Sequence, residues 1–318
     1  MRRATIYLNL WMAVHLELEH ALELCKQGDV NEDDYLYAWD KAVAFYTGSI
    51  AKQANGNAFE GYSLYTLAKE RCMFSATCSD KVTTEPGITE PKTVNVANVN
   101  EKIFQYFNQG QQNLLDAKCV DVAVMVQKIT QQMSVPLLQG ILHFAYSMDL
   151  GNQQNDDGKD LEAEGAVFSA SVLPLIHHCN ADDAGVLYEH MRTDNGVDIT
   201  DFKTVMEVME RNLECLGITC QDLGGVADVV NDDRTYLEGG EPCHYKQAST
   251  LPPGSSISGS GGTTAVLNTS TQQDAGPNVG LAVGMVVGLV VAFALITALV
   301  SFNGRSQKEY DGPNNEEA

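Results

Sequence analysis

Carboxylate, phenol and imidazole side chains are the groups in this sequence that could hold a metal ion. His15 and Glu19 stand four residues apart in a stretch with helical periodicity, so they share one face of a helix. A carboxylate on a mostly apolar helix is costly to bury unless it has a partner. Oxygen ligands with an imidazole suit ferric iron, and an all-oxygen set would suit calcium. This pair is therefore the first candidate for a metal site.

Further candidate ligands lie on the segments that follow. Asp40, Tyr46 and Glu164 complete the predicted metal-ligand set. Arg71 is the predicted partner of a bound anion, and an ion pair with Asp40 or Glu70 is the alternative for it. Taken singly, each of these residue types more often lies on a solvated face or in the core.

Catalytic motifs are missing from the sequence, which contains no GxSxG, no P-loop and no HExxH. We therefore expect a protein that is not an enzyme. The chain carries 42 acidic against 20 basic residues, a formal charge of −22 at pH 7. Such a balance repels the phosphates of nucleic acid and attracts cations, so no nucleic-acid partner is expected.

Apolar residues recur at helical spacing through most of the first 216 residues. In the first segment, 6–27, Leu10, Val14 and Leu18 return to one face, and Gly28 is a suitable stop. Further helices are expected at 35–48, 61–72, 96–115, 120–133, 135–150, 160–179, 181–191 and 200–216.

Pro136 separates two of these helices, because proline suits the first turn of a helix. No stretch alternates with period two for long enough to predict a strand. The expected fold class is all-α.

Eight cysteines indicate an oxidising compartment. They are Cys25, Cys72, Cys78, Cys119, Cys179, Cys215, Cys220 and Cys243. An even number favours up to four disulfides, but many connectivities are open. Cys72 with Cys78, and Cys215 with Cys220, are close enough to bridge locally. No pair has CxxC spacing, so structural zinc is not expected.

Residues 279–302 form an uncharged apolar segment, VGLAVGMVVGLVVAFALITALVSF. As a helix it is long enough to cross a bilayer, and we predict a single transmembrane helix. Asp274 precedes it, whereas Arg305 and Lys308 follow it, so the positive-inside rule places the tail, 303–318, in the cytosol. The expected location is the plasma membrane, with the bulk of the chain extracellular or periplasmic.

Within this segment Gly280, Gly284 and Gly288 recur every fourth residue. Such a stripe lets two helices approach closely and favours a homodimer in the membrane. The general frequency of glycine in membrane helices is the alternative explanation.

The stretch 246–278 is rich in Ser, Thr, Gly and Pro, a composition that cannot bury enough apolar surface to fold. It is expected to be a flexible stalk, and Asn268 begins a glycosylation sequon within it. The predicted domains are a helical domain (1–245), the stalk, the membrane helix (279–302) and the tail (303–318).

The amino-terminal segment does not fit a secretory leader, because it carries Asn9, His15 and Glu17 and lacks a small-residue cleavage site. An ectodomain needs such a leader. We therefore expect that the natural protein has residues upstream of this chain.

Five segments of the helical domain have a distinctive sequence. They read YAWDKAVAFYTGS, GYSLYTLAKERCMFSATC, VNEKIFQYFNQGQQNL, VPLLQGILHFAYSMD and EAEGAVFSASVLPLIHHC. Together they resemble the iron-assimilation domain of algae, which occurs in low-iron-inducible periplasmic proteins and in membrane-anchored phytotransferrins. The likeness runs from Tyr7 to Met191, and WDKAVAFYTGS is its most specific piece.

The resemblance implies a surface protein that captures ferric iron, with carbonate as a synergistic anion, before internalisation. If phenolate and carboxylates hold the metal, acid should release it, because protons compete for each ligand. The alternative function is a structural or adhesion ectodomain that binds calcium or a partner protein. Binding that does not depend on iron, with a calcium-dependent shift in melting temperature, would favour the alternative.

Overall fold

The computed structural model describes residues 2–28, 32–48, 62–83, 92–154, 159–193, 200–229 and 235–243. The predicted stalk, membrane helix, glycine stripe, glycosylation sequon and tail lie outside the described residues. None of the helices in the described ranges combines the length and the apolar character needed to cross a bilayer.

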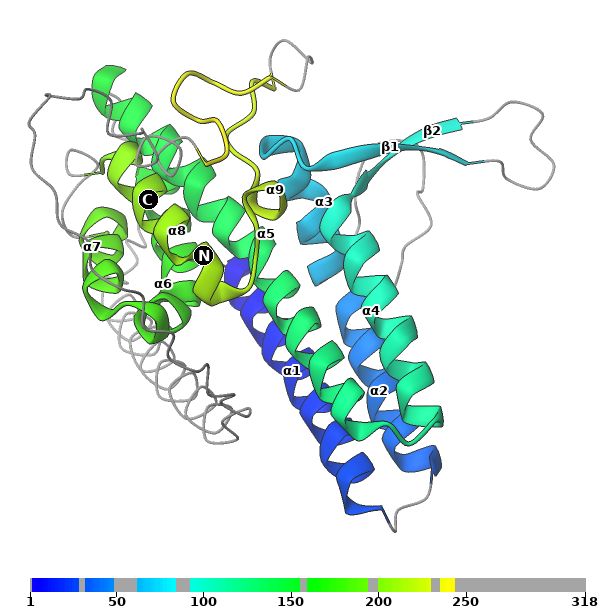
Figure 1. Ribbon diagram of the computed structural model, residues 1–318. Helices are drawn as coiled ribbons and strands as arrows, with labels where there is room; N and C mark the ends of the chain where they lie inside the picture. The colour runs from blue at the N-terminus through cyan, green and yellow to red at the C-terminus, as the bar shows by residue number, and fades with distance from the viewer. Residues whose placement is uncertain are drawn as a thin grey trace, which may run out of the picture. The chain divides into compact units, whose positions relative to one another are not determined.

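The described chain is mostly helical, as expected from the periodicity (Figure 1). Its elements are α1 (Arg2–Gln27), α2 (Glu32–Thr47), α3 (Leu64–Phe74), β1 (Cys78–Thr83), β2 (Lys92–Ala97), α4 (Asn98–Leu115), α5 (Cys119–Gln154), α6 (Lys159–Cys179), α7 (Ala181–Met191), α8 (Phe202–Leu216) and α9 (Cys220–Leu223).

Strands β1 and β2 form an antiparallel hairpin, so the strict all-α prediction was wrong in this detail. The pairing runs from Cys78 opposite Ala97 to Thr83 opposite Lys92. In β2 the alternation of polar and apolar residues covers only TVNVA, which is too short for a clear strand signal. Figure 1 shows the hairpin extending from the ends of α3 and α4.

Helix α5 continues through Pro136, so the prediction of two helices divided at this proline was wrong. A proline inside a helix removes a hydrogen bond and costs about 3 kcal/mol. Residues 132–142 are all buried, and packing on every side offsets that cost because tertiary context overrides local preference.

Helix α5 is also the element that connects two groups of helices. It packs with α1, α3 and α4, and α2 contacts each of these three helices. It also packs with α6 and α8, and α7 contacts both of these. Gly140 of α5 allows the close approach of α6, since a Cβ there would lie 2.6 Å from the ring of Phe168.

Four disulfides connect these elements. They are Cys25–Cys119, Cys72–Cys78, Cys179–Cys215 and Cys220–Cys243. The expected local bridge between Cys72 and Cys78 is confirmed. The expected bridge between Cys215 and Cys220 is wrong, because the packing of α8 on α6 brings Cys215 to Cys179 at the end of α6.

Candidate functional site

The five predicted metal ligands lie on three helices and at different depths. His15 and Glu19 lie on α1, Asp40 and Tyr46 on α2, and Glu164 on α6. His15 and Tyr46 are buried, Glu19 is half-buried, and Asp40 and Glu164 are exposed. Within the described ranges, no three His, Cys, Asp or Glu side chains gather into a group that could hold a metal ion. The ligand set therefore stays a prediction.

The His15 side chain packs between α1 and α5. Its Nδ1 lies 3.3 Å from Oγ1 of Thr130, and its ring centroid lies 5.4 Å from that of Trp11. Burial lowers the pKa of His15, so the imidazole is neutral at pH 7. Burial also raises the pKa of Glu19 on the same helix. Neutral imidazole is the form that can bind a metal.

Tyr46 of α2 donates a hydrogen bond of 2.5 Å to Oδ1 of Asn100 on α4. Nδ2 of Asn100 in turn donates to the carbonyl oxygen of Tyr65, 3.0 Å away. Burial, with a smaller contribution from Tyr65, raises the pKa of Tyr46 well above its ordinary value. Tyr46 is therefore a protonated donor here. Asp40, on the same helix, accepts a hydrogen bond of 3.2 Å from Gln111.

Arg71, the predicted anion partner, is buried among aromatic rings. Its guanidinium carbon lies 5.7 Å from the ring centroid of Phe74, 5.3 Å from that of Phe144 and 5.1 Å from that of Phe168. Nη2 lies 3.4 Å from Oε1 of Glu70, so one of the ion pairs considered from the sequence is present. The rings stabilise the cation through their negative faces.

His143 lies beside this cluster and was not among the residues singled out from the sequence. Its ring centroid lies 4.5 Å from that of Phe74 and 5.3 Å from that of Phe144. Burial, and secondly the charge of Arg71, lower the pKa of His143 to about 4. The residue lies within a long apolar run of α5, so its sequence context offers no signal for a role.

A cleft of 440 Å³ opens between α3, the hairpin and α4. It is lined by Tyr65, Lys81, Val96, Asn100, Glu101, Phe104, Gln105 and Asn108. Sequence reasoning missed it because one wall is the hairpin, which no periodicity predicted. Asn100 is its most buried lining residue, at 1% exposure.

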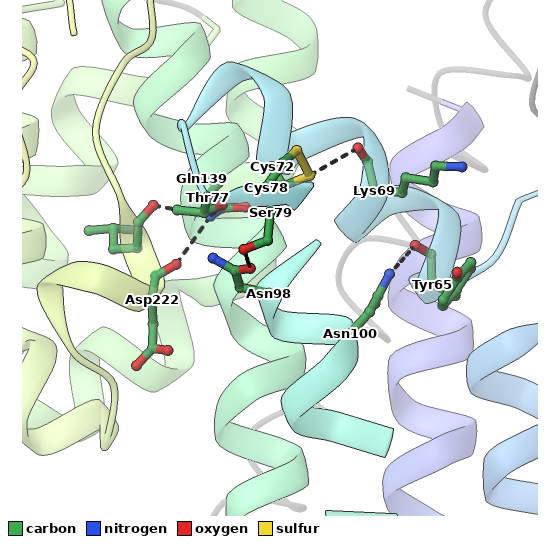
Figure 2. Close-up of a disulfide and its surroundings, with 11 residues drawn as sticks. Tyr65, Lys69, Cys72, Thr77, Cys78, Ser79, Asn98, Asn100, Gln139 and Asp222 are labelled. Carbon is green, nitrogen blue, oxygen red and sulfur yellow. Dashed lines mark hydrogen bonds between the residues drawn. A yellow bond between two sulfur atoms is a disulfide. The ribbon is translucent and has the colours of Figure 1, made fainter. Parts of the chain in front are cut away.

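The walls of this cleft are connected by a disulfide and by hydrogen bonds (Figure 2). Cys72 near the end of α3 is bonded to Cys78, the first residue of β1. The backbone N–H of Asn98, which begins α4, donates to the carbonyl of Thr77 at 3.1 Å. The hydroxyl of Ser79 donates to Oδ1 of Asn98. These bonds fix the hairpin against both helices.

Gln139 of α5 attaches the same junction to α9 (Figure 2). Its Nε2 lies 3.0 Å from Oγ1 of Thr77, 3.2 Å from the carbonyl oxygen of Asp222 and 3.1 Å from that of Leu223. The carboxylate of Asp222 pairs with Lys102 of α4. Hydrogen bonds from Gln139 therefore connect the junction beside the cleft to α5 and α9.

Comparisons with protein-family models, with curated proteins and with solved structures find no significant match to this chain. The resemblance to the algal iron-assimilation domain therefore stays a prediction that rests on the five sequence segments. Each segment falls on a different helix, in order from α2 to α6.

Proposed function

We propose that this chain is a cell-surface protein that captures ferric iron together with carbonate. The observation that carries the proposal is the resemblance of the five segments on α2 to α6 to the iron-assimilation domain. Four disulfides support a location in an oxidising compartment outside the cytosol. The formal charge of −22 supports a cation as cargo. No catalytic activity is proposed.

The proposed iron ligands are His15, Glu19, Asp40, Tyr46 and Glu164. His15 and Glu19 come first, because they are one turn apart on α1 and the imidazole is held neutral by burial. Tyr46 is the least favourable of the five ligands, because a phenol must lose its proton to bind iron. Burial raises the pKa of Tyr46, and its hydroxyl proton is donated to Asn100.

Arg71 is the proposed partner of carbonate. Burial among aromatic rings leaves its guanidinium charged, because arginine does not lose its proton in proteins. The planar fork of a guanidinium matches a planar oxyanion in two parallel hydrogen bonds.

The proposed anchor is the apolar segment 279–302, which places the helical domain outside the plasma membrane. Its stripe of Gly280, Gly284 and Gly288 is the proposed contact of a homodimer. Crosslinking of the native chain and of Gly284→Leu in membranes tests the contact. An unchanged yield of dimer in the variant would contradict the proposed helix–helix contact.

Titration of ferric iron into the full chain, with and without bicarbonate, tests the proposed function. We expect saturable binding that bicarbonate strengthens. His15→Ala and Glu19→Gln should each weaken it at least tenfold, which corresponds to about 1.4 kcal/mol. Glu23→Gln is the matched control, since Glu23 is exposed on the same helix.

Absence of saturable iron binding under both conditions would end the proposal. Iron-independent binding of a partner, with a calcium-dependent rise in melting temperature, would point to the structural or adhesion alternative.

A further inference from the structure

The cleft between α3, the hairpin and α4 has the dimensions of a small-molecule site. Its 440 Å³ falls within the range of about 300–1,000 Å³ that is common for ligand pockets. None of the five proposed iron ligands lines it, and Arg71 does not line it either. The cleft is therefore a second site, which Tyr46 reaches only through its hydrogen bond to Asn100, and its binding of a ligand can be tested without iron.

The charges that line the cleft cancel each other. Nζ of Lys81 on β1 lies 2.6 Å from Oε1 of Glu101 on α4, and the other lining residues are uncharged. A strongly charged ligand would be attracted by one member of this pair and repelled by the other. The balance of charge therefore favours a neutral, polar ligand.

Two aromatic rings, together with Val96, form the apolar part of the cleft. The ring centroids of Tyr65 and Phe104 lie 5.9 Å apart, and the ring planes meet at 63°. Both side chains are half-buried. An aromatic face accepts weak C–H contacts, which is how the C–H face of a sugar ring packs on protein.

Two amides stand at the edge of the cleft. Gln105 and Asn108 lie one turn apart on α4 and are exposed, and among the described residues their side-chain amides have no hydrogen-bond partner. Each amide offers both a donor and an acceptor. That combination matches a sugar hydroxyl, which donates one hydrogen bond and accepts others.

The floor of the cleft is fixed before any ligand arrives. Asn100 is held by the Tyr46 hydroxyl and by the carbonyl of Tyr65. The disulfide between Cys72 and Cys78 holds the hairpin wall to α3. A pre-formed site avoids the cost of ordering its own side chains on binding.

From these observations we infer that the cleft binds a neutral sugar, with the ring of Phe104 against its C–H face, Tyr65 beside it, and Gln105 and Asn108 on the hydroxyls. The sugar is either free in solution or the end of a glycan. Both sources present the same ring and hydroxyl groups to the cleft.

The test uses the full 318-residue chain with its disulfides formed. Saturation-transfer NMR and calorimetry would measure binding of glucose, galactose, mannose and N-acetylglucosamine, each as monosaccharide and as an oligosaccharide. Tighter binding of an oligosaccharide would identify a glycan end, and equal binding would identify the free sugar. We expect saturable binding of at least one of these sugars.

Variants locate the site on α4. Gln105→Ala and Phe104→Leu should each weaken sugar binding at least tenfold. Gln109→Ala is the matched control, because Gln109 is exposed on the same helix and does not line the cleft. Melting temperature separates loss of binding from loss of folding, and Gln105→Ala should leave it unchanged.

Three results would overturn the inference. They are no binding of any neutral sugar at millimolar concentration, a preference for sialic acid over neutral sugars, and equal weakening by Gln105→Ala and Gln109→Ala. Loss of iron binding without loss of sugar binding would contradict the proposed function and leave this inference standing.

Discussion

The hydroxyl of Tyr46 on α2 donates a hydrogen bond to Oδ1 of Asn100 on α4, 2.5 Å away inside the core. Both side chains are 1% exposed. A buried amide oxygen needs a donor, and this contact supplies one while it joins the two helices. The same amide forms the floor of the cleft, so core packing and the candidate sugar site share one residue.

Tyr46→Phe is expected to destabilise the fold by about 1–3 kcal/mol, because it leaves the buried Oδ1 of Asn100 without its donor. Urea unfolding measures the loss. Tyr37→Phe is the control on the same helix, since Tyr37 is 67% exposed, and it should change stability by less than about 0.5 kcal/mol. Equal effects of the two variants would contradict the importance of this hydrogen bond.

Gly110→Ala is expected to destabilise α4 although alanine is the better helix former. A Cβ at Gly110 would lie 2.2 Å from Cζ2 of Trp39, whose Nε1 donates to the carbonyl of Phe107 at 3.1 Å. The crowding should cost about 1–3 kcal/mol. At Gly185 on α7 a Cβ meets nothing within 4 Å, so Gly185→Ala should stabilise by about 0.5–1 kcal/mol. Thermal unfolding distinguishes the opposite signs.

Removal of the bridge between Cys25 and Cys119 is expected to cost more stability than removal of the bridge between Cys72 and Cys78. The sequence separations are 94 and 6, and a longer loop gains more entropy in the unfolded chain when it is opened. In the chain-entropy model the difference is about 2 kcal/mol. Denaturant unfolding of the two double Cys→Ser variants measures it, and a larger loss for the short loop would refute the expectation.

Folding stability should fall as pH drops from about 6.5 to about 4 because of His143. Its folded pKa is about 4, below the ordinary value of 6.5, so in this window the unfolded chain binds a proton that the folded chain does not. The free energy of unfolding has its full value above pH 6.5. It has lost about 3 kcal/mol through this residue once the pH is below 4. His143→Gln should flatten the profile of unfolding free energy against pH, and an unchanged slope would contradict the pKa. Exposed His178→Gln is the control.

Bound iron should be released as pH falls toward about 5, because protons compete with the metal for each proposed ligand. Burial lowers the pKa of His15 and raises the pKa of Glu19. Dialysis at a series of pH values with iron analysis measures the release, and retention at about pH 5 would contradict it.

Helical periodicity predicted the fold well where the signal is local. Apolar residues such as Leu18 in α1 and Leu213 in α8 repeat with the helical period and face the core, and both are buried. The hairpin, the continuity of α5 through Pro136 and the pairing of Cys215 with Cys179 depend on contacts far apart in the sequence. No local pattern contains that information.

For the candidate sites too, the sequence indicated residue types but not which residues lie together. Residue types predicted His15 as a metal ligand and Arg71 as the partner of an anion. Both side chains are buried, and both roles stay predictions. Which side chains come together could not be predicted, because it depends on how α1, α3 and α5 pack. The cleft was missed with the hairpin, and His143 was missed because its neighbours in sequence are those of any core helix.

The central claim is that this chain takes up ferric iron. Metal analysis of the purified full chain after incubation with a ferric salt, bicarbonate and excess calcium, followed by desalting at pH 7, tests it most directly. The proposal predicts that iron is retained in a fixed ratio to protein, and that His15→Ala lowers this ratio. Calcium without iron, or no metal at all, would contradict it.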